Sequence, residues 1–331
     1  MKAITYNPNS DKFSLSELPM VEPNANEVLV KVLACALNPV DTKIVNWHAS
    51  VPIMDANFVV GLDVVGEIVE LSTNNAEWRV GERVLFHGDM LHKNGGLAEY
   101  TVQRADAITR MPNNVPIDVA ASTPCAGWTA WRALVDRLAI HTQQSIFIAG
   151  GSGGVGSFAI QIAKHFDVKQ IIVSCSARNT EYVKSLGATH VVDYAESDIK
   201  QEVMAITNGC GVDVALDCVG NTSEQVCANV LKYEGQMVEL VETANLTSYY
   251  QAKLRGITVH QLSLGAGYRN GSEGIKAIVR AGRAFNELLS IDRIHPPKLT
   301  HIALEDAGKA LMQIREQRTV GKIIVMLDKH A

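Results

Sequence analysis

Residues 145–166, SIFIAGGSGGVGSFAIQIAKHF, decide the fold of this chain. A short run of apolar and small residues (145–149) leads into a glycine-rich turn, in which Gly151, Gly153 and Gly156 have the spacing G-x-G-x-x-G. After the turn, apolar residues recur at helical spacing, which is typical of a helix that packs one face against a sheet. These apolar residues are Val155, Phe158, Ala159, Ile162, Ala163 and Phe166.

A strand, a glycine turn and an amphipathic helix in this order predict a nucleotide-binding unit. Glycines allow the tight turn and bring backbone N–H groups against a pyrophosphate, which lies at the positive end of the helix. A flexible glycine linker is the alternative, but it does not explain the pattern on both sides of the turn. The candidate cofactor-binding residues here are Gly151, Ser152, Gly153, Gly154, Val155 and Gly156.

The residues after the next predicted strand indicate which nucleotide is bound. An NAD site usually carries an acidic residue about 20 positions beyond the glycines, where it binds the ribose 2′-hydroxyl. Residues 174–179 read SCSARN, with Ser176 and Arg178 but no carboxylate. An arginine in place of the acid favours a 2′-phosphate, so we expect NADPH. The alternative is that Arg178 only begins a solvated helix.

The rest of the chain shows two different patterns of apolar residues. The first 120 or so residues form short alternating runs such as 27–38 and 82–88, separated by Pro, Asn and Gly, which predicts an all-β sandwich or barrel. From residue 145 onward, continuous apolar runs alternate with amphipathic ones, which predicts an α/β doubly wound parallel sheet. The tail is expected to form one helix and a last strand that could return to the first domain.

The composition of the chain excludes several classes of protein. The 331 residues carry a formal net charge of −5, which argues against nucleic-acid and anionic-membrane partners. No run of 18 apolar residues is present, and the N-terminal residues read as a strand rather than a signal peptide. The six cysteines are scattered without a C-x-x-C pair, so we expect reduced thiols and a cytoplasmic location.

With these motifs in place, the chain resembles the medium-chain dehydrogenase/reductase superfamily, in particular its zinc-free quinone oxidoreductase and enone reductase branch. The resemblance covers essentially the whole length and rests on GLDVVGEIVE, RVGERVLF, GGLAEYTV, TPCAGWTAWRAL, GGSGGVG, KSLGATHVVDY, DVALDCVG and GKIIV. It implies a GroES-like β-barrel catalytic domain (1–121 and 290–331), a Rossmann NADP-binding domain (122–289), an active site between them, and a homodimer or homotetramer.

The resemblance also permits a test for zinc. The positions of the three catalytic zinc ligands are occupied by Asn38, Leu62 (followed by Asp63) and Cys125, and residues 85–99 lack the four cysteines of the structural zinc lobe. One thiol does not hold a catalytic zinc, which needs three protein ligands. The loose histidines His48, His87 and His92 could improvise a site, but His87 and His92 lack ligand spacing and we favour a surface-loop position for these two. We therefore expect no metal, and expect Asp63 to hydrogen-bond to backbone or to a basic side chain.

A site without a Lewis acid is poorly suited to oxidising simple alcohols and better suited to reducing electron-poor acceptors. We therefore expect hydride transfer from NADPH to quinones or α,β-unsaturated carbonyl compounds. The candidate catalytic residues are Asn38, Thr129 and His48: Asn38 as a hydrogen-bond donor, Thr129 near the nicotinamide by resemblance, and His48 as a proton donor. An asparagine that only caps a turn before Pro39 is an equally good interpretation of Asn38. Asp41 and Trp47 are weaker candidates.

The resemblance adds cofactor contacts beyond the glycine turn. It points to Tyr194 beside Ser176 and Arg178 near the 2′-phosphate, although a half-buried tyrosine at a strand end is the alternative. Val219 and Gly220 end a strand on the ligand-binding edge of the sheet, and Arg318 could also reach the cofactor.

Two other functions compete with this prediction: a zinc-type alcohol dehydrogenase with atypical ligands, and a non-catalytic NADPH-binding protein.

Overall fold

The computed structural model describes residues 1–47, 49, 51, 54–55, 57–72, 77–316 and 321–327. Contacts divide the chain into two compact units. The first comprises Met1–Trp128, Gly265–Asp292 and Pro296–Ala331, and the second comprises Thr129–Leu264 with Arg293–His295. The domain division made from the sequence, at 121/122 and 289/290, stays a prediction.

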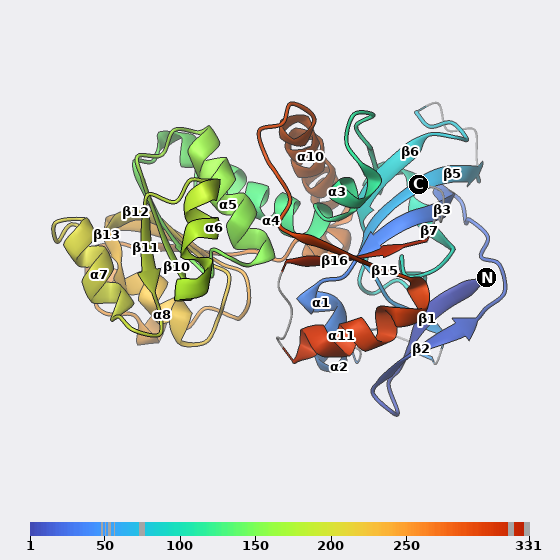
Figure 1. Ribbon diagram of the computed structural model, residues 1–331, viewed down its shortest axis with the longest axis horizontal. Coiled ribbons are helices and arrows are strands. Elements are labelled where there is room, and N and C mark those ends of the chain that lie inside the picture. Colours follow the sequence, from blue (N-terminus) through green and yellow to red (C-terminus); the bar gives the residue numbers. More distant parts are fainter. Residues whose placement is uncertain are drawn as a thin grey trace. The chain divides into compact units, whose positions relative to one another are not determined.

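The first unit is built on two sheets (Figure 1). A seven-stranded sheet has the order β15-β16-β3-β5-β6-β8, with β7 also paired to β3, and a three-stranded sheet has the order β2-β1-β4. The strands are β1 (Lys2–Asn7), β2 (Lys12–Glu17), β3 (Glu27–Ala36), β4 (Phe58–Val59), β5 (Asp63–Leu71), β6 (Arg83–His87), β7 (Tyr100–Arg104), β8 (Thr109–Arg110), β15 (Leu299–Ile302) and β16 (Lys322–Met326).

The prediction that the tail returns to the first domain is confirmed. β16 pairs antiparallel with β3, placing Ile324 opposite Ala36, and Val325 opposite Cys35. Its apolar residues Ile324 and Val325 are fully buried and join the core of this unit. The N-terminal strand was also predicted, and it pairs with β2 along its whole length.

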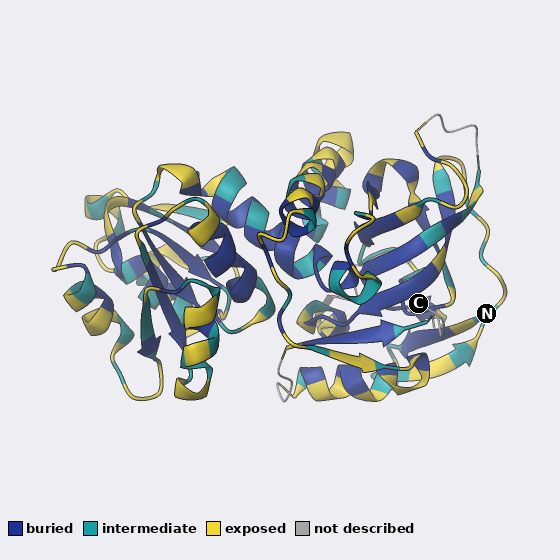
Figure 2. Cartoon of the chain, turned by 45° about the horizontal axis from the view of Figure 1, so that its top comes forward, coloured by how far each residue is buried: buried dark blue, intermediate teal, exposed yellow. Residues whose placement is uncertain are grey.

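Helices cover the sheets of the first unit. They are α1 (Pro39–Thr42), α2 (Ile44–Trp47), α3 (Ile117–Ala121), α10 (Gly271–Ser290) and α11 (Ala307–Arg315), and a π-helical turn spans Pro124–Trp128. The 20-residue α10 packs through Gly282 on the ring of Trp128 and through Phe285 on Gly127. In Figure 2 the strands are largely buried, while α10 and α11 each have one buried and one exposed face.

The second unit is the doubly wound sheet that the sequence predicted. Its six strands have the order β11-β10-β9-β12-β13-β14, and every pair is parallel. They are β9 (Ser145–Ala149), β10 (Gln170–Cys175), β11 (His190–Asp193), β12 (Val212–Asp217), β13 (Leu231–Glu239) and β14 (Thr258–Gln261). The helices are α4 (Thr129–Trp131), α5 (Gly154–His165), α6 (Thr180–Leu186), α7 (Ile199–Ile206), α8 (Thr222–Asn229) and α9 (Ala252–Arg255).

The strand order of this sheet decides where ligands can bind. The chain leaves β9 toward β10 on one side and later returns to place β12 on the other side of β9. In open parallel sheets, ligands bind at the carboxyl ends of the strands where the order reverses in this way. The glycine turn follows β9 directly, so it lies at that point. Among the described residues, no helix is long and apolar enough to cross a membrane.

Candidate functional site

The glycine turn has the conformation that a phosphate site requires. Gly150 has φ +75°, and Gly151 N–H donates to Ser174 O at 3.1 Å while Gly153 N–H donates to Gly150 O at 3.0 Å. A Cβ at position 156 would lie 2.7 Å from Gly151 Cα, so only glycine allows this close approach of turn and helix. Helix α5 begins at Gly154, and its first N–H groups lack partners within the helix, which suits a phosphate.

The other predicted cofactor residues all follow the carboxyl ends of neighbouring parallel strands. Ser176 and Arg178 follow β10, Tyr194 follows β11, and Val219 and Gly220 follow β12. Arg178 is exposed, Tyr194 is 58% exposed and Val219 is 50% exposed, so their side chains are accessible to a ligand. The sheet therefore brings the predicted cofactor set to one edge, but whether these residues bind a cofactor stays a prediction.

Two residues of this edge were missed by sequence reasoning. Asn179 Nδ2 donates to Ser152 Oγ at 3.0 Å and to Ser176 Oγ at 3.2 Å, which ties the glycine turn to the loop after β10. Asp193, which lies opposite Cys175 in the register of β10 and β11, accepts from Ala177 N at 3.1 Å and from Ala195 N at 3.0 Å. A carboxylate is thus present near this loop, but its oxygens are bonded to the turn. The only sequence signal was its position at a strand end.

In the first unit, a hydrogen-bonded network surrounds Asp63, the first residue of β5. Lys322, the first residue of β16, places Nζ 2.5 Å from Asn38 Oδ1 and 3.3 Å from Asp63 Oδ2. Asn38 Nδ2 donates to Asp63 Oδ2 at 2.9 Å, and Cys125 N–H donates to Asp63 Oδ1 at 2.7 Å. The side chains of Asp63 and Lys322 are 0% and 6% exposed. The prediction that Asp63 hydrogen-bonds to backbone or to a basic side chain is confirmed, and partners of both kinds are present.

Asn38 and Asp41 form the outer part of this network. Asn38 N–H donates to Asp41 Oδ2 at 2.7 Å, as in a helix cap at the start of α1. The two amide hydrogens of the Asn38 side chain have acceptors in Asp63 and in Ala36 O, the latter at 3.3 Å. Burial raises the pKa of Asp41 to about 7, and its Oδ1 has no partner among the described residues. This geometry favours the turn-capping interpretation of Asn38, and its catalytic role stays a prediction.

The remaining predicted catalytic residues are only partly visible. Thr129 begins α4, is 8% exposed, and its hydroxyl has no hydrogen-bond partner among the described residues. His48 and Arg318 lie outside the described residues, as does the side chain of Trp47.

The surface-loop position expected for His87 is wrong. His87 is the last residue of β6 and is 3% exposed, because β6 pairs with β5 and puts it opposite Asp63. Burial lowers the pKa of its imidazole, and its Nδ1 lies 2.8 Å from Gly88 O. The apolar run RVLF that precedes it was a signal that the strand continues to His87.

The comparisons with known proteins agree with this arrangement. Residues 24–113 match the family described as "alcohol dehydrogenase GroES-like domain", and residues 154–279 match the family described as "zinc-binding dehydrogenase". The chain is 30% identical over 321 residues to the trans-enoyl reductase pgmF of Aspergillus terreus, covering 92% of this chain and 87% of that protein. The chain belongs to the medium-chain dehydrogenase/reductase superfamily.

Two other known proteins extend the likeness. A chloroplast envelope quinone oxidoreductase homolog of Arabidopsis thaliana is 30% identical over 253 residues, covering 74% of this chain and 75% of that protein. The structure of mycobacterial Rv1454c complexed with NADPH has the same fold, with a TM-score of 0.84, 23% identity, and coverage of 98% of this chain and 100% of that one. The predicted family, the α/β Rossmann fold and the GroES-like domain are confirmed, and the chain is an oxidoreductase of this superfamily.

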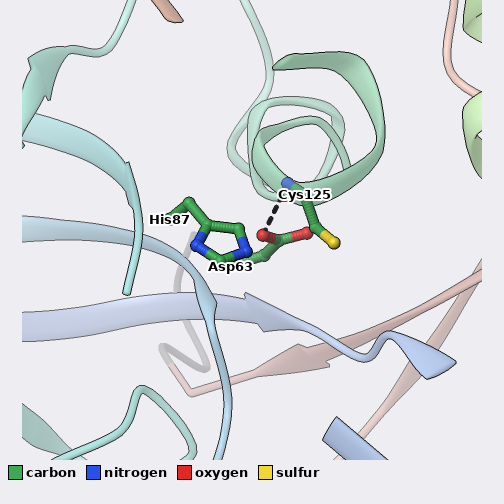
Figure 3. Close-up of side chains that lie close together, drawn as sticks. All are labelled: Asp63, His87 and Cys125. Carbon is green, nitrogen blue, oxygen red and sulfur yellow. Dashed lines mark hydrogen bonds between the residues drawn. The ribbon is translucent and has the colours of Figure 1, made fainter. Parts of the chain in front are cut away.

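Because one matching family description names zinc, the fit of the site to that metal needs a test. Asp63, His87 and Cys125 each offer a ligand atom, and these atoms lie within 4.8 Å of one another (Figure 3). However, both oxygens of Asp63 already accept hydrogen bonds, and the Lys322 ammonium lies beside one of them. Desolvation raises the pKa of the Cys125 thiol well above its usual value, which disfavours the thiolate that zinc needs. The residues do not fit a zinc ion.

Sequence reasoning missed Lys322. The motif GKIIV contributed only to the family resemblance, although a lysine that opens an apolar strand carries a signal of its own. A buried lysine is rarely found without an acidic partner, so its presence in β16 points to a buried carboxylate such as Asp63.

Proposed function

We propose that this protein is an NADPH-dependent, zinc-independent reductase of quinones or α,β-unsaturated carbonyl compounds. The observation that carries the proposal is the Lys322 ammonium bound to Asn38 and Asp63, because it occupies the side chains that would otherwise serve a metal. The names of the relatives, a quinone oxidoreductase homolog and a trans-enoyl reductase, support the same two acceptor classes.

The cofactor part of the proposal rests on the second unit. The glycine turn and the start of α5 offer N–H groups to a pyrophosphate, and the exposed guanidinium of Arg178 offers a bidentate partner to a 2′-phosphate. When bound, NADPH supplies the hydride. Asn179 fixes the distance between the two loops by its bonds to Ser152 and Ser176.

The acceptor classes follow from what the chain's own residues can do. Reduction of an enone or a quinone produces an enolate or phenolate, which needs hydrogen bonds and a proton rather than a Lewis acid. Thr129 offers a hydroxyl, and His48 is the proposed proton donor. Asn38 acts as a positioning residue in this proposal, because its amide hydrogens are held by Asp63 and Ala36.

Thermal unfolding with each cofactor tests the NADPH preference. We expect NADPH to raise the unfolding temperature more than NADH does, since a ligand that binds only the native state stabilises it in proportion to its affinity. Arg178→Glu should reverse this order. Lys169→Glu, at an exposed lysine before β10 and therefore at the opposite end of the strand, makes the same charge change and should not. Equal protection of the wild type by both cofactors would contradict the proposal.

The acceptor and the metal are tested on purified protein. We expect NADPH oxidation with quinones or enones to exceed that with simple aldehydes and ketones, and to be unaffected by chelators. One competing function, a zinc alcohol dehydrogenase with atypical ligands, would have to use the Asp63, His87 and Cys125 cluster. About one tightly bound zinc per chain, together with oxidation of simple alcohols, would establish that alternative.

A further inference from the structure

Two carboxyl side chains face each other in the interior of the second unit. Asp217 is the last residue of β12 and Glu239 is the last residue of β13, and the register of these parallel strands puts them directly opposite each other. Asp217 is 0% exposed and Glu239 is 1% exposed. Two adjacent carboxylates that are shielded from solvent repel each other, so ionising both of them costs much free energy. We therefore expect the pair to share one proton.

The hydrogen bonds show which of the two carries the proton. Asp217 Oδ1 accepts from Val219 N at 2.9 Å, from Gly220 N at 3.2 Å and from Ser223 Oγ at 2.8 Å. Glu239 Oε1 accepts from two N–H groups. Its Oε2 is buried, and no N–H or O–H group among the described residues donates to it. A proton on Oε2 would satisfy it by donating to Asp217.

The groups around Glu239 that the structure describes are acids, thiols and a phenol. The groups that face Glu239 are Cys218 after β12, Cys227 on α8 and Tyr249 beside η7 (Leu246–Ser248). Tyr249 in turn donates to the carboxylate of Glu224 on α8. Burial, together with the hydrogen bond to Asp217, raises the pKa of Glu239 to about 7.

The pair anchors two loops at the carboxyl edge of the sheet. Val219 and Gly220 are held by Asp217, while Val241 N and Glu242 N donate to Glu239 Oε1 at 2.6 and 2.9 Å. The loops also touch each other, since a Cβ at position 220 would lie 2.8 Å from the side chain of Val241. Four backbone N–H groups on two loops therefore depend on one protonated pair.

We propose that Glu239 is a positioning residue that shares a proton with Asp217 and thereby holds the loops after β12 and β13 in the conformation that binds the nicotinamide cofactor. This inference rests on the proposed function, which places Val219 and Gly220 against the cofactor. Ionisation of Glu239 puts a second negative charge beside Asp217 and separates the loops. Cofactor affinity is accordingly full when Glu239 is protonated and falls as the pH rises through about 7.

The test measures the dissociation constant of NADPH by fluorescence across the neutral range. In the wild type we expect it to rise by about tenfold between about pH 6 and about pH 9, the change that follows when the pKa of Glu239 is higher by about one in the NADPH complex than in the free protein. Glu239→Gln keeps an N–H donor for Asp217 and a carbonyl acceptor for the loop, so it should bind tightly with a flat profile. Glu234→Gln, which removes an exposed carboxylate from the same strand, should keep the wild-type profile.

A second measurement does not need the cofactor. Infrared spectra of the protein alone should show protonated carboxyl absorption that disappears through about pH 7. Asp41 contributes to it in both proteins, so the band of Glu239 is the part that the wild type shows and Glu239→Gln lacks. Identical pH profiles in wild type and Glu239→Gln, or no such band, would overturn the inference while leaving NADPH binding intact. A wild-type protein that shows the band but binds neither NADPH nor NADH at any pH would instead overturn the proposed function, and the cofactor role of Glu239 with it.

Discussion

Replacement of Lys322 by methionine is the most direct test of the network in the first unit. Methionine keeps the length and the apolar stem of the side chain but removes the ammonium that lies 3.3 Å from Asp63 Oδ2 and 2.5 Å from Asn38 Oδ1. Asp63 is fully buried, so its charge cannot be hydrated in the variant. We therefore expect Lys322→Met to lower the free energy of unfolding of the first unit.

The size of the effect can be worked out from the geometry. At 3.3 Å and an effective dielectric constant of about 20, the attraction between the two charges is about 5 kcal/mol. Removing one partner of a buried ion pair costs roughly 3–5 kcal/mol in proteins. Asp63 retains the hydrogen bonds from Cys125 N and Asn38 Nδ2, which continue to stabilise its charge. The expected loss is therefore near the lower end of that range, about 3 kcal/mol.

Urea unfolding followed by tryptophan fluorescence is the assay. Of the four tryptophans, Trp78 and Trp128 are buried in the first unit, so the signal reports mainly on that unit. Lys309→Met, at an exposed lysine on α11, is the matched control and should change stability by less than about 0.5 kcal/mol.

A double variant separates the ion pair from other effects of the substitution. Lys322→Met combined with Asp63→Asn removes both charges, and its cost should be smaller than the sum of the two single substitutions by roughly 2 kcal/mol. A loss below about 1 kcal/mol in Lys322→Met, the size seen for exposed pairs, would refute the reasoning. Strict additivity in the double variant would refute it as well.

Two further predictions concern the glycine turn and the metal. Gly156→Ala should abolish thermal protection by NADPH, because the new Cβ would lie 2.7 Å from Gly151 Cα. Gly153→Ala should keep most of the protection, because its Cβ would lie 3.3 Å from Gly150 O. Equal loss of protection in the two variants would contradict this prediction. In Lys322→Met, Co²⁺ should produce a thiolate charge-transfer band through Asp63, His87 and Cys125, which the added substitution Cys125→Ser removes. The wild type should show no such band, and one at about one cobalt per chain would overturn the assignment of Lys322 as the cation of this site.

The sequence predicted the second unit well because its signals are local. The turn at Gly151–Gly156 follows directly from β9 and opens α5, so the motif and its structural context are contiguous in the chain. The strands β10, β11, β12 and β13 were visible as apolar runs, since strands buried on both faces need them. β14, with the residues TVHQ, carries no such run, and only its pairing to β13 makes it a strand.

The network of the first unit could not be predicted in full because its members are far apart in sequence. Asp63 and Lys322 are separated by 259 positions in the sequence. They come together because β5 and β16, which begin with these residues, both pair with β3. The motifs around Asn38 and Leu62 indicate lost zinc ligands, but no local pattern tells which cation takes their place. His87 was misplaced for the same reason, because its burial follows from the pairing of β6 with β5.

One physical requirement connects the two units. A carboxylate without access to water needs either a cation or a proton, and hydrogen bonds alone compensate it only in part. Asp63 has the first solution, an ammonium that belongs to the same fold, so its environment depends on the chain itself and not on a bound ion. Glu239 has the second, a proton taken from solution, and the pKa of about 7 ties the conformation of its loop to pH. It follows that pH changes near neutrality should alter cofactor binding through the second unit. A variant of Lys322 and a variant of Glu239 should therefore have additive effects on stability, and only the latter should change the pH profile of NADPH binding.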